Sequence, residues 1–273
     1  MRSTGTWDPT AYALYGGERT RPFLDLLARI EADDPQVIVD LGCGNGPATL
    51  LLAQRWPQAR IIGVDNSASM LEAAREADTA GTVEWVKADL RTWDPATVGA
   101  PIDVIVTNAA LQWVPGHLSL LDRWVAALAP EGWLALQVPG NFDAPSHALM
   151  SQVAQTHPRA AELEDALEVL GVGEPVTYLR TLTRLGCSVD AWETTYLHVL
   201  QAGEAEHPVL TWVRATGLRP VLDLLTDENE REAFLTPYDA ALHTAYPILE
   251  GTAVFGFRRV FAVARRRPSL TAG

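Results

Sequence analysis

The chain has 273 residues, a hydrophobic fraction of 48% and a formal net charge of −13, from 21 lysine and arginine residues against 34 aspartate and glutamate residues. This negative balance argues against nucleic acid as a partner, because phosphate contacts require a basic surface. The length exceeds that of one small domain, typically about 100 to 200 residues, so we expect a cap or second lobe beside a single core.

The sequence has no apolar stretch of the length that a membrane span needs, and its opening, MRSTGTWDPT, lacks the apolar core of a secretory signal. We therefore expect a cytoplasmic protein without a membrane partner, either a monomer or a homodimer. Cys43 and Cys187 are predicted to be small buried residues. The six histidines show no paired ligand spacing, so no metal site is predicted.

Along the chain, residues 11–32 are expected to be helical. From residue 33 onward, short apolar runs alternate with amphipathic segments, which is the pattern of a doubly wound parallel sheet covered on both faces. Pro47 fits the first turn of a helix, Ser67 fits an N-cap, and Pro130 should stop a helix. The predicted strands are residues 37–41, 60–64, 83–87, 102–107 and 133–138, and the predicted helices are residues 47–54, 68–77 and 118–128.

After Pro139 the rhythm changes, with helical patterns over residues 146–155 and 162–170 and a helical block over residues 212–246. Two further strands are expected at residues 187–199 and 252–265. The predicted fold class is therefore α/β, with a Rossmann-like, doubly wound, seven-stranded and mostly parallel sheet that carries helical cap insertions.

The first predicted strand runs directly into a G-x-G-x-G turn formed by Gly42, Gly44 and Gly46. Without a Cβ atom, glycine lets the backbone turn tightly and approach a ligand. The loop alone does not separate S-adenosylmethionine from a dinucleotide, although dinucleotide enzymes typically carry G-x-G-x-x-G. Asp40, just before the turn, would be awkward beside a pyrophosphate but suits a ligand with an ammonium and a sulfonium group.

Two more carboxylates stand where parallel strands expose their carboxyl ends. Asp65 ends the second strand, about 20 residues past the loop, where an acid can accept both ribose hydroxyls. Asp89 follows the third strand and could accept a hydrogen bond from an adenine amino group while Leu90 covers the ring. Each acid alone could be a helix cap or a solvated turn, but three in register favour S-adenosylmethionine.

These residues resemble the class I Rossmann-like S-adenosylmethionine-dependent methyltransferases, through VDLGCGNG, GVDNSASML, VKADLRTW and TNAALQWV. With YALYGGERTRP, NFDAPSHALM, TTYLH, WVRATGLRP and VFGFRRVFAVARR, residues 7–267 resemble the trans-aconitate 2-methyltransferase family. The resemblance implies methyl transfer from S-adenosylmethionine to one carboxylate of trans-aconitate, which yields a monomethyl ester and S-adenosylhomocysteine. It also implies a small anionic tricarboxylate as the partner.

This chemistry can be argued independently. A carboxylate is ionised at neutral pH, with a reference pKa near 4, so no general base is needed for its attack on the methyl group. Positioning the oxygen and the methyl carbon about 3 Å apart can supply roughly 7 to 11 kcal/mol.

The resemblance divides the chain into an N-terminal helical cap segment (1–32), a cofactor-binding Rossmann-like core (33–140) and a helical substrate cap around the last two strands (141–273). The expected cofactor-binding residues are Asp40, Gly42, Gly44, Asp65, Asn66, Met70, Asp89, Leu90 and Asn108. Those expected closest to methyl transfer are Asn108, Gln112 and Trp113.

Substrate candidates are arginines, whose planar fork matches a carboxylate, and side chains that add oriented donors or walls. They are Tyr15, Arg19, Arg21, Tyr196, His198, Trp212, Arg214, Arg219 and Arg258. Three alternatives stay open: a methyltransferase acting on another small carboxylate or natural-product acid, an NAD-type oxidoreductase, and a non-catalytic S-adenosylmethionine-binding module.

Overall fold

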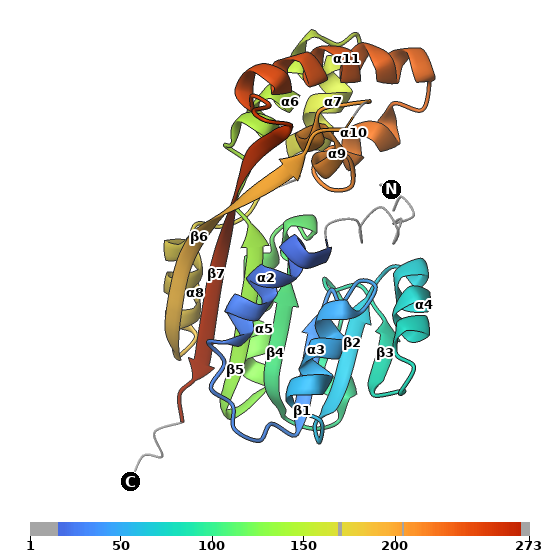
Figure 1. Cartoon of the computed structure of the whole chain (residues 1–273). Helices are drawn as coiled ribbons and strands as arrows, with labels where there is room; N and C mark the ends of the chain where they lie inside the picture. Colours follow the sequence, from blue (N-terminus) through green and yellow to red (C-terminus); the bar gives the residue numbers. More distant parts are fainter. Residues whose placement is uncertain (1–15, 169–170, 204, 269–273) are drawn as a thin grey trace. The chain divides into compact units, whose positions relative to one another are not determined.

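The computed structural model describes residues 16–168, 171–203 and 205–268 (Figure 1). Its seven strands are β1 (Val37–Leu41), β2 (Arg60–Asp65), β3 (Val83–Lys87), β4 (Ile102–Asn108), β5 (Leu128–Pro139), β6 (Cys187–Gln201) and β7 (Thr252–Arg266). They form one sheet in the order β3-β2-β1-β4-β5-β7-β6. The pairs β1–β2, β1–β4, β2–β3 and β4–β5 are parallel. The predicted fold class, a seven-stranded and mostly parallel α/β sheet, is confirmed.

Helices connect and cover the strands. They are α2 (Gly16–Leu27), α3 (Pro47–Arg55), α4 (Ala68–Ala77), α5 (Leu121–Ala127), α6 (Pro145–Thr156), α7 (Ala160–Glu168), α8 (Pro175–Arg184), α9 (Pro208–Arg214), α10 (Arg219–Leu224) and α11 (Glu228–Ala245). Three short 3-10 turns are η1 (Pro95–Val98), η2 (Leu111–Trp113) and η3 (His117–Leu120). Of the helical segment predicted over residues 11–32, residues 11–15 lie outside the described part, and α2 ends at Leu27, five residues earlier than predicted.

Local sequence signals explain how the helices near the glycine loop begin. Gly46 adopts φ +93° as the N-cap of α3, and Pro47 occupies the first turn, where a missing N–H costs no helical hydrogen bond. Ser67 caps α4 by accepting a hydrogen bond from the Met70 amide at 3.4 Å. Both predicted helix starts are confirmed, and they place the first turns of α3 and α4 just after β1 and β2.

Several predicted elements differ from the structure, and one helix of the structure was not predicted. The helix predicted over residues 118–128 is the turn η3 followed by α5, and Pro130 lies inside β5, which begins at Leu128 instead of residue 133. The helix α8 was not predicted. The predicted block 212–246 begins earlier and forms three helices, because Pro220 starts a new one in the first turn of α10.

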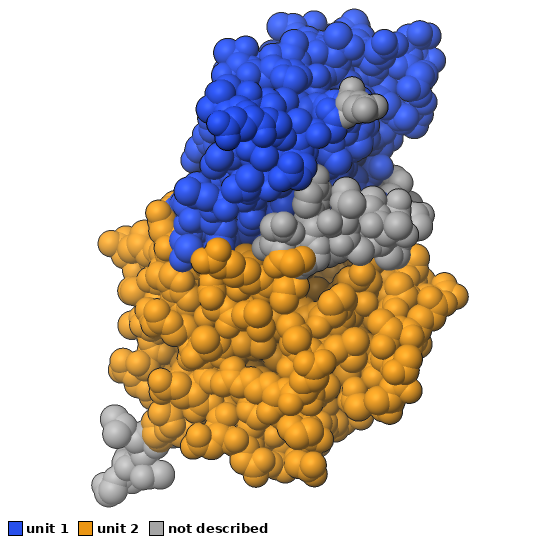
Figure 2. Space-filling model, viewed as in Figure 1, with its two compact units in different colours: residues 1–15, 139–171, 194–259 blue, residues 16–138, 172–193, 260–273 orange. Residues whose placement is uncertain are grey.

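The chain divides into two compact units (Figure 2). Unit 1 comprises residues 1–15, 139–171 and 194–259, and its core includes Trp212, Phe234 and Phe255. Unit 2 comprises residues 16–138, 172–193 and 260–273, and its core packs α5 and α8 against one face of the sheet, where Trp124 and Tyr178 are buried. The division into cofactor core and substrate cap that the sequence suggests remains a functional proposal.

Candidate active site

The strand register gathers three predicted polar residues on one face of the sheet in unit 2. Asp40 of β1 is paired with Gly63 of β2 and with Val106 of β4. Since alternate residues of a strand share a face, Asp65 and Asn108, each two positions further along, lie on the same face as Asp40. All three stand at the carboxyl ends of their strands, the edge at which open α/β sheets bind ligands.

Gln137 is a fourth residue of this group, and it was not predicted from the sequence. We call the four residues Asp65, Asp40, Asn108 and Gln137 the polar row. It lies in β5 directly opposite Asn108 in the parallel register, so the two side chains share a face. Gln137 is 1% exposed. The signal was present in the sequence, because Gln137 interrupts the otherwise apolar segment between Leu134 and Val138. A buried strand has no packing reason for an amide at that position.

Asp40 is the buried acid of the polar row. Its carboxylate is 1% exposed and accepts a hydrogen bond of 2.6 Å from the Thr49 hydroxyl in α3. Burial raises the pKa of Asp40 to about 7, the negative charge of Asp65 adds to this rise, and the bond from Thr49 opposes it. A nearby cation would therefore stabilise the ionised form of Asp40 at neutral pH.

The glycine loop joins β1 to α3 with positive φ angles that other residues rarely adopt. Gly42 has φ +82° and Gly44 has φ +56°. A Cβ atom on Gly42 would lie 2.2 Å from the Ala110 Cβ, so this glycine lets the loop after β4 approach β1. Among the described residues, no atom lies within 4 Å of the position that a Cβ on Gly44 would take, so this part of the chain leaves its backbone accessible. The loop thus combines close internal packing at Gly42 with access at Gly44.

Asp65 holds the glycine loop and the start of α4 together. Its Oδ2 accepts a hydrogen bond from the Gly44 amide at 2.9 Å, and its Oδ1 accepts one from the Ser67 amide at 2.8 Å. Burial raises the pKa of Asp65 although these backbone bonds oppose the rise. Asn66 beside it is exposed, and Met70 in the first turn of α4 is buried.

The acid after β3 is engaged by a neighbouring arginine. Asp89 receives hydrogen bonds from the Arg91 guanidinium, including Nε to both carboxylate oxygens at 3.0 Å, and these bonds lower the pKa of Asp89. A ligand amino group would share the carboxylate with Arg91. Leu90 is buried, and one of its methyl carbons lies 3.8 Å from the position of a Cβ on Gly42, so it borders the glycine loop.

The loop after β4 presents carbonyl oxygens that lack donors. Asn108 Oδ1 and Gln112 Oε1 are buried and have no hydrogen-bond partner within the described protein, although Gln112 Nε2 donates to the Ala109 carbonyl at 2.6 Å. Ala109 has φ +52°, an uncommon conformation for alanine that turns the chain directly after the strand. Trp113, in η2, is partly buried. Buried acceptors without donors are costly, so they indicate that a ligand or water supplies the missing bonds.

Unit 1 holds the predicted aromatic substrate residues within its core. Tyr196, His198 and Trp212 are 3%, 7% and 1% exposed. The rings of His198 and Trp212 stack with centroids 4.7 Å apart, and Trp212 also contacts Phe255 and Phe257. The structure therefore brings His198 and Trp212 together and gives them a packing role in the core of this unit.

The predicted arginines have different surroundings. Arg214 forms an ion pair of 2.5 Å with Glu206, and Arg219 lies 3.9 Å from Asp223. Arg258 in β7 donates from Nη1 to the Gly140 carbonyl at 3.3 Å, and its amide donates to Asn141 Oδ1. Arg21 is exposed on α2. Tyr15 and the side chain of Arg19 lie outside the described residues.

Another arginine was not singled out from the sequence. Arg259 is 6% exposed, and its guanidinium lies 4.3 Å from the centroid of the Phe257 ring. Its neighbour Arg258, in contrast, is partly exposed. Alternation along β7 separates the two, because adjacent strand residues point to opposite faces. Sequence alone could not decide which of the two adjacent arginines would be buried.

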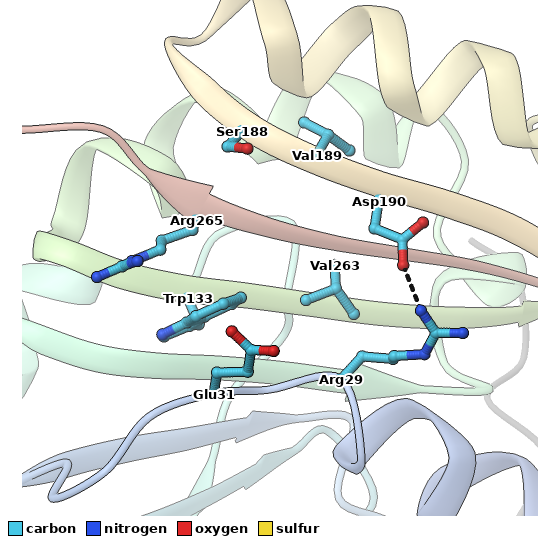
Figure 3. Close-up of a pocket in the computed structure, with 8 residues that line it drawn as sticks. All are labelled: Arg29, Glu31, Trp133, Ser188, Val189, Asp190, Val263 and Arg265. Carbon is cyan, nitrogen blue, oxygen red and sulfur yellow. Dashed lines mark hydrogen bonds and ion pairs between the residues drawn. The ribbon is translucent and has the colours of Figure 1, made fainter.

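A pocket of about 320 Å³ lies elsewhere in unit 2 (Figure 3). Arg29 and Asp190 form an ion pair of 2.9 Å there, and Trp133 and Arg265 face the same space. Trp133 precedes Gln137 by four residues of β5, about 13 Å of extended strand, so this pocket lies toward the other end of the strand. We do not assign it to the active site, because the polar row occupies the opposite edge of the sheet.

The described residues contain neither a metal cluster nor a membrane-spanning helix. No group of three or more histidine, cysteine, aspartate or glutamate side chains in that part of the chain could hold a metal ion. Within the same part, no helix is both long and apolar enough to span a membrane. Cys43 and Cys187 are buried free cysteines, as predicted.

Comparison with known sequences shows similarity over nearly the whole chain. The model of the methyltransferase domain family matches residues 38–132. A trans-aconitate 2-methyltransferase of Streptomyces avermitilis is 52% identical over 268 residues, which cover 96% of this chain and 97% of that protein. A protein of the same name from Mycobacterium tuberculosis is 44% identical, covering 94% of this chain and 96% of its own length.

Solved structures share the fold at low sequence identity. The YcgJ protein from Bacillus subtilis has a TM-score of 0.59 and 13% identity, covering 91% of this chain and 99% of that chain. Phosphoethanolamine N-methyltransferase 2 of Haemonchus contortus, solved with S-adenosyl-L-methionine, has a TM-score of 0.57 and 15% identity, covering 95% of this chain and 56% of that chain. At these identities the similarity concerns the fold alone.

Proposed function

Because the chain belongs to the trans-aconitate 2-methyltransferase family, we propose that it transfers a methyl group from S-adenosylmethionine to one carboxylate of trans-aconitate. The products are the monomethyl ester and S-adenosylhomocysteine. The observation that carries this proposal is the 52% identity to a trans-aconitate 2-methyltransferase over 96% of the chain. The polar row at the carboxyl edge of the sheet supplies a site for the reaction.

The residues at this edge fit S-adenosylmethionine. No described atom lies over Gly44, which would admit a ligand against the backbone. Asn108 Oδ1 and Gln112 Oε1 have no donor in the described part of the chain, and an ammonium group would offer one. Asp40 and Asp65 place negative charge beside the loop, which favours a cation. We assign the ribose hydroxyls to Asp65 and the adenine ring to Asp89 and Leu90, with Asn66 and Met70 bordering the nucleoside.

The cofactor, when bound, supplies an electrophilic methyl group on a positively charged sulfur. An oxygen lone pair of the acceptor carboxylate forms the new O–C bond, and the C–S bond breaks with its electron pair going to sulfur. No proton moves, so the chain needs no general base. The task of Asn108, Gln112 and Trp113 is to hold the reacting groups in line and to exclude water, which accounts for most of the expected rate gain.

The acceptor requires local positive charge. A tricarboxylate would be repelled by a protein with a formal net charge of −13 unless arginines converge where it binds. We propose that Arg258 contributes, because its guanidinium is partly exposed and its planar fork matches the geometry of a carboxylate. Arg214 is a weaker candidate, since Glu206 already holds it. The other predicted substrate residues remain proposals: Tyr15, Arg19, Arg21, Tyr196, His198, Trp212 and Arg219.

Incubation with methyl-labelled S-adenosylmethionine and a panel of di- and tricarboxylates tests the function. We expect label in an ester of trans-aconitate and much less in citrate or in dicarboxylates that lack its geometry. If label appears only in an ester of another acid, the proposed acceptor is wrong but the methyltransferase activity stands. Absence of transfer to every acceptor, with cofactor binding intact, would favour a non-catalytic binding module.

A further inference from the structure

Gln137 buries an amide that the fold itself does not satisfy. Its side chain is 1% exposed, and neither Nε2 nor Oε1 has a hydrogen-bond partner within the described protein. Leaving both atoms unpaired forfeits the bonds that the amide makes with water in the unfolded chain. An apolar side chain of the same shape would avoid this loss, so packing does not explain why β5 carries glutamine here.

The position of Gln137 relates it to the reacting groups. It lies opposite Asn108 and on the same face as Asp40 and Asp65, so the row runs from β2 through β1 and β4 to β5. Neighbouring strands are about 4.8 Å apart, which places Gln137 roughly 10 Å beyond β1. If the nucleoside lies at the ends of β2 and β3, as in the proposed function, its sulfur end points along the row toward β4 and β5. Gln137 then stands on the acceptor side.

We infer that Gln137 binds the acceptor, with Nε2 donating a hydrogen bond to the carboxylate that receives the methyl group. This inference rests on the proposed function and adds to it a residue that selects for a carboxylate. A neutral amide orients the carboxylate by a hydrogen bond and does not pair its negative charge with a cation, so the attacking oxygen stays nucleophilic. Oε1 of the same amide remains available for a water or for a donor of the bound ligand.

Three variants test this inference. Gln137→Met keeps the length of the side chain but removes both polar atoms, and Gln137→Glu replaces the donor by a carboxylate that repels the acceptor. Thr107→Val is the matched control, because Thr107 is fully buried in β4, its hydroxyl also has no hydrogen-bond partner among the described residues, and the register places it on the other face. We expect Thr107→Val to retain the acceptor KM of the parent.

Kinetics and calorimetry measure the effect. For Gln137→Met, kcat/KM for trans-aconitate should fall by about 10- to 100-fold, the loss expected for one hydrogen bond to a charged group. For Gln137→Glu, kcat/KM for trans-aconitate should fall further. Titration of S-adenosylhomocysteine should give the parent Kd for both variants, whereas trans-aconitate should bind their S-adenosylhomocysteine complexes more weakly. The ligand-free Tm of Gln137→Met should equal or exceed that of the parent, because an unpaired buried amide has been removed.

The outcomes separate the inference from the function. A parent that methylates trans-aconitate, together with a Gln137→Met variant of unchanged kinetics, overturns the inference alone. Weaker S-adenosylhomocysteine binding with unchanged acceptor binding also overturns it, since Gln137 would then contact the cofactor. A lower ligand-free Tm with parent kinetics would show a merely structural residue. A parent without activity on trans-aconitate overturns the proposed function, and this inference falls with it.

Discussion

The substitution Asp40→Asn should change the stability of the ligand-free protein more favourably in mild alkali than in mild acid. Burial raises the pKa of Asp40 from 3.8 to about 7, despite the hydrogen bond from Thr49. Because the folded-state pKa lies above the unfolded value, ionising Asp40 favours unfolding. The stability that the protonated carboxyl retains below about pH 4 is therefore lost as the pH rises through 7.

The size of the effect follows from linkage. A gap of about three pKa units, at about 1.36 kcal/mol each, gives a penalty of about 4 kcal/mol at pH 8 and roughly 1.5 kcal/mol at pH 5. Asparagine keeps an oxygen for Thr49 but adds a buried NH2 group, which costs about 1 to 3 kcal/mol at either pH if it finds no partner. The difference between the two pH values, about 2 to 3 kcal/mol, is independent of that cost.

Thermal unfolding of the ligand-free parent and variant measures this difference. Relative to the parent, the Tm of Asp40→Asn should be about 4 to 12 °C higher at pH 8 than at pH 5. Asp89→Asn is the control, because the hydrogen bonds from Arg91 lower the pKa of Asp89 and leave it ionised in both states across this window. An equal Tm change for Asp40→Asn at both pH values would refute the reasoning.

Three other substitutions address the cofactor and acceptor subsites. Asp65→Ala should weaken S-adenosylmethionine binding by about 1 to 3 kcal/mol through loss of bonds to the ribose, and unchanged affinity in titration calorimetry would refute that assignment. Gly44→Ala should lower cofactor affinity with a Tm loss smaller than that of Gly42→Ala, whose Cβ would lie 2.2 Å from the Ala110 Cβ; equal Tm losses would contradict this. Arg258→Ala should raise the acceptor KM roughly 10-fold with cofactor affinity intact, and equal kinetics in variant and parent would count against it.

The core of the fold could be predicted from local patterns. Apolar runs identified β1, β2 and β4 to within one residue, because strands buried on both faces tolerate few polar positions. The edge strand β3 was also located correctly, although most of its residues are exposed. The G-x-G-x-G turn and Pro47 located the start of α3 for reasons that are local to the backbone. By contrast, α8 was not predicted, because its threonines and valine weaken its helical propensity. The helix is stabilised by Tyr178 and Leu182, which pack into the core.

The candidate site was only partly accessible from sequence. The acids Asp40 and Asp65 stand at the ends of predicted strands, so their common edge followed from the topology of a parallel sheet. The engagement of Asp89 by Arg91 and of Arg214 by Glu206 did not follow, because ion pairs depend on how side chains meet in space. Those pairs decide how much of each charge is left for a ligand.

The amino-acid sequence by itself thus determined the strands, the glycine turn and the acids beside it, since each depends on neighbouring residues and on the periodicity of the backbone. Only the tertiary structure revealed that Gln137 lies opposite Asn108 and that Asp40 is fully buried with a raised pKa. Register between separate strands and the loss of solvent around a carboxylate arise from contacts distant in the chain. No local pattern of residues encodes them.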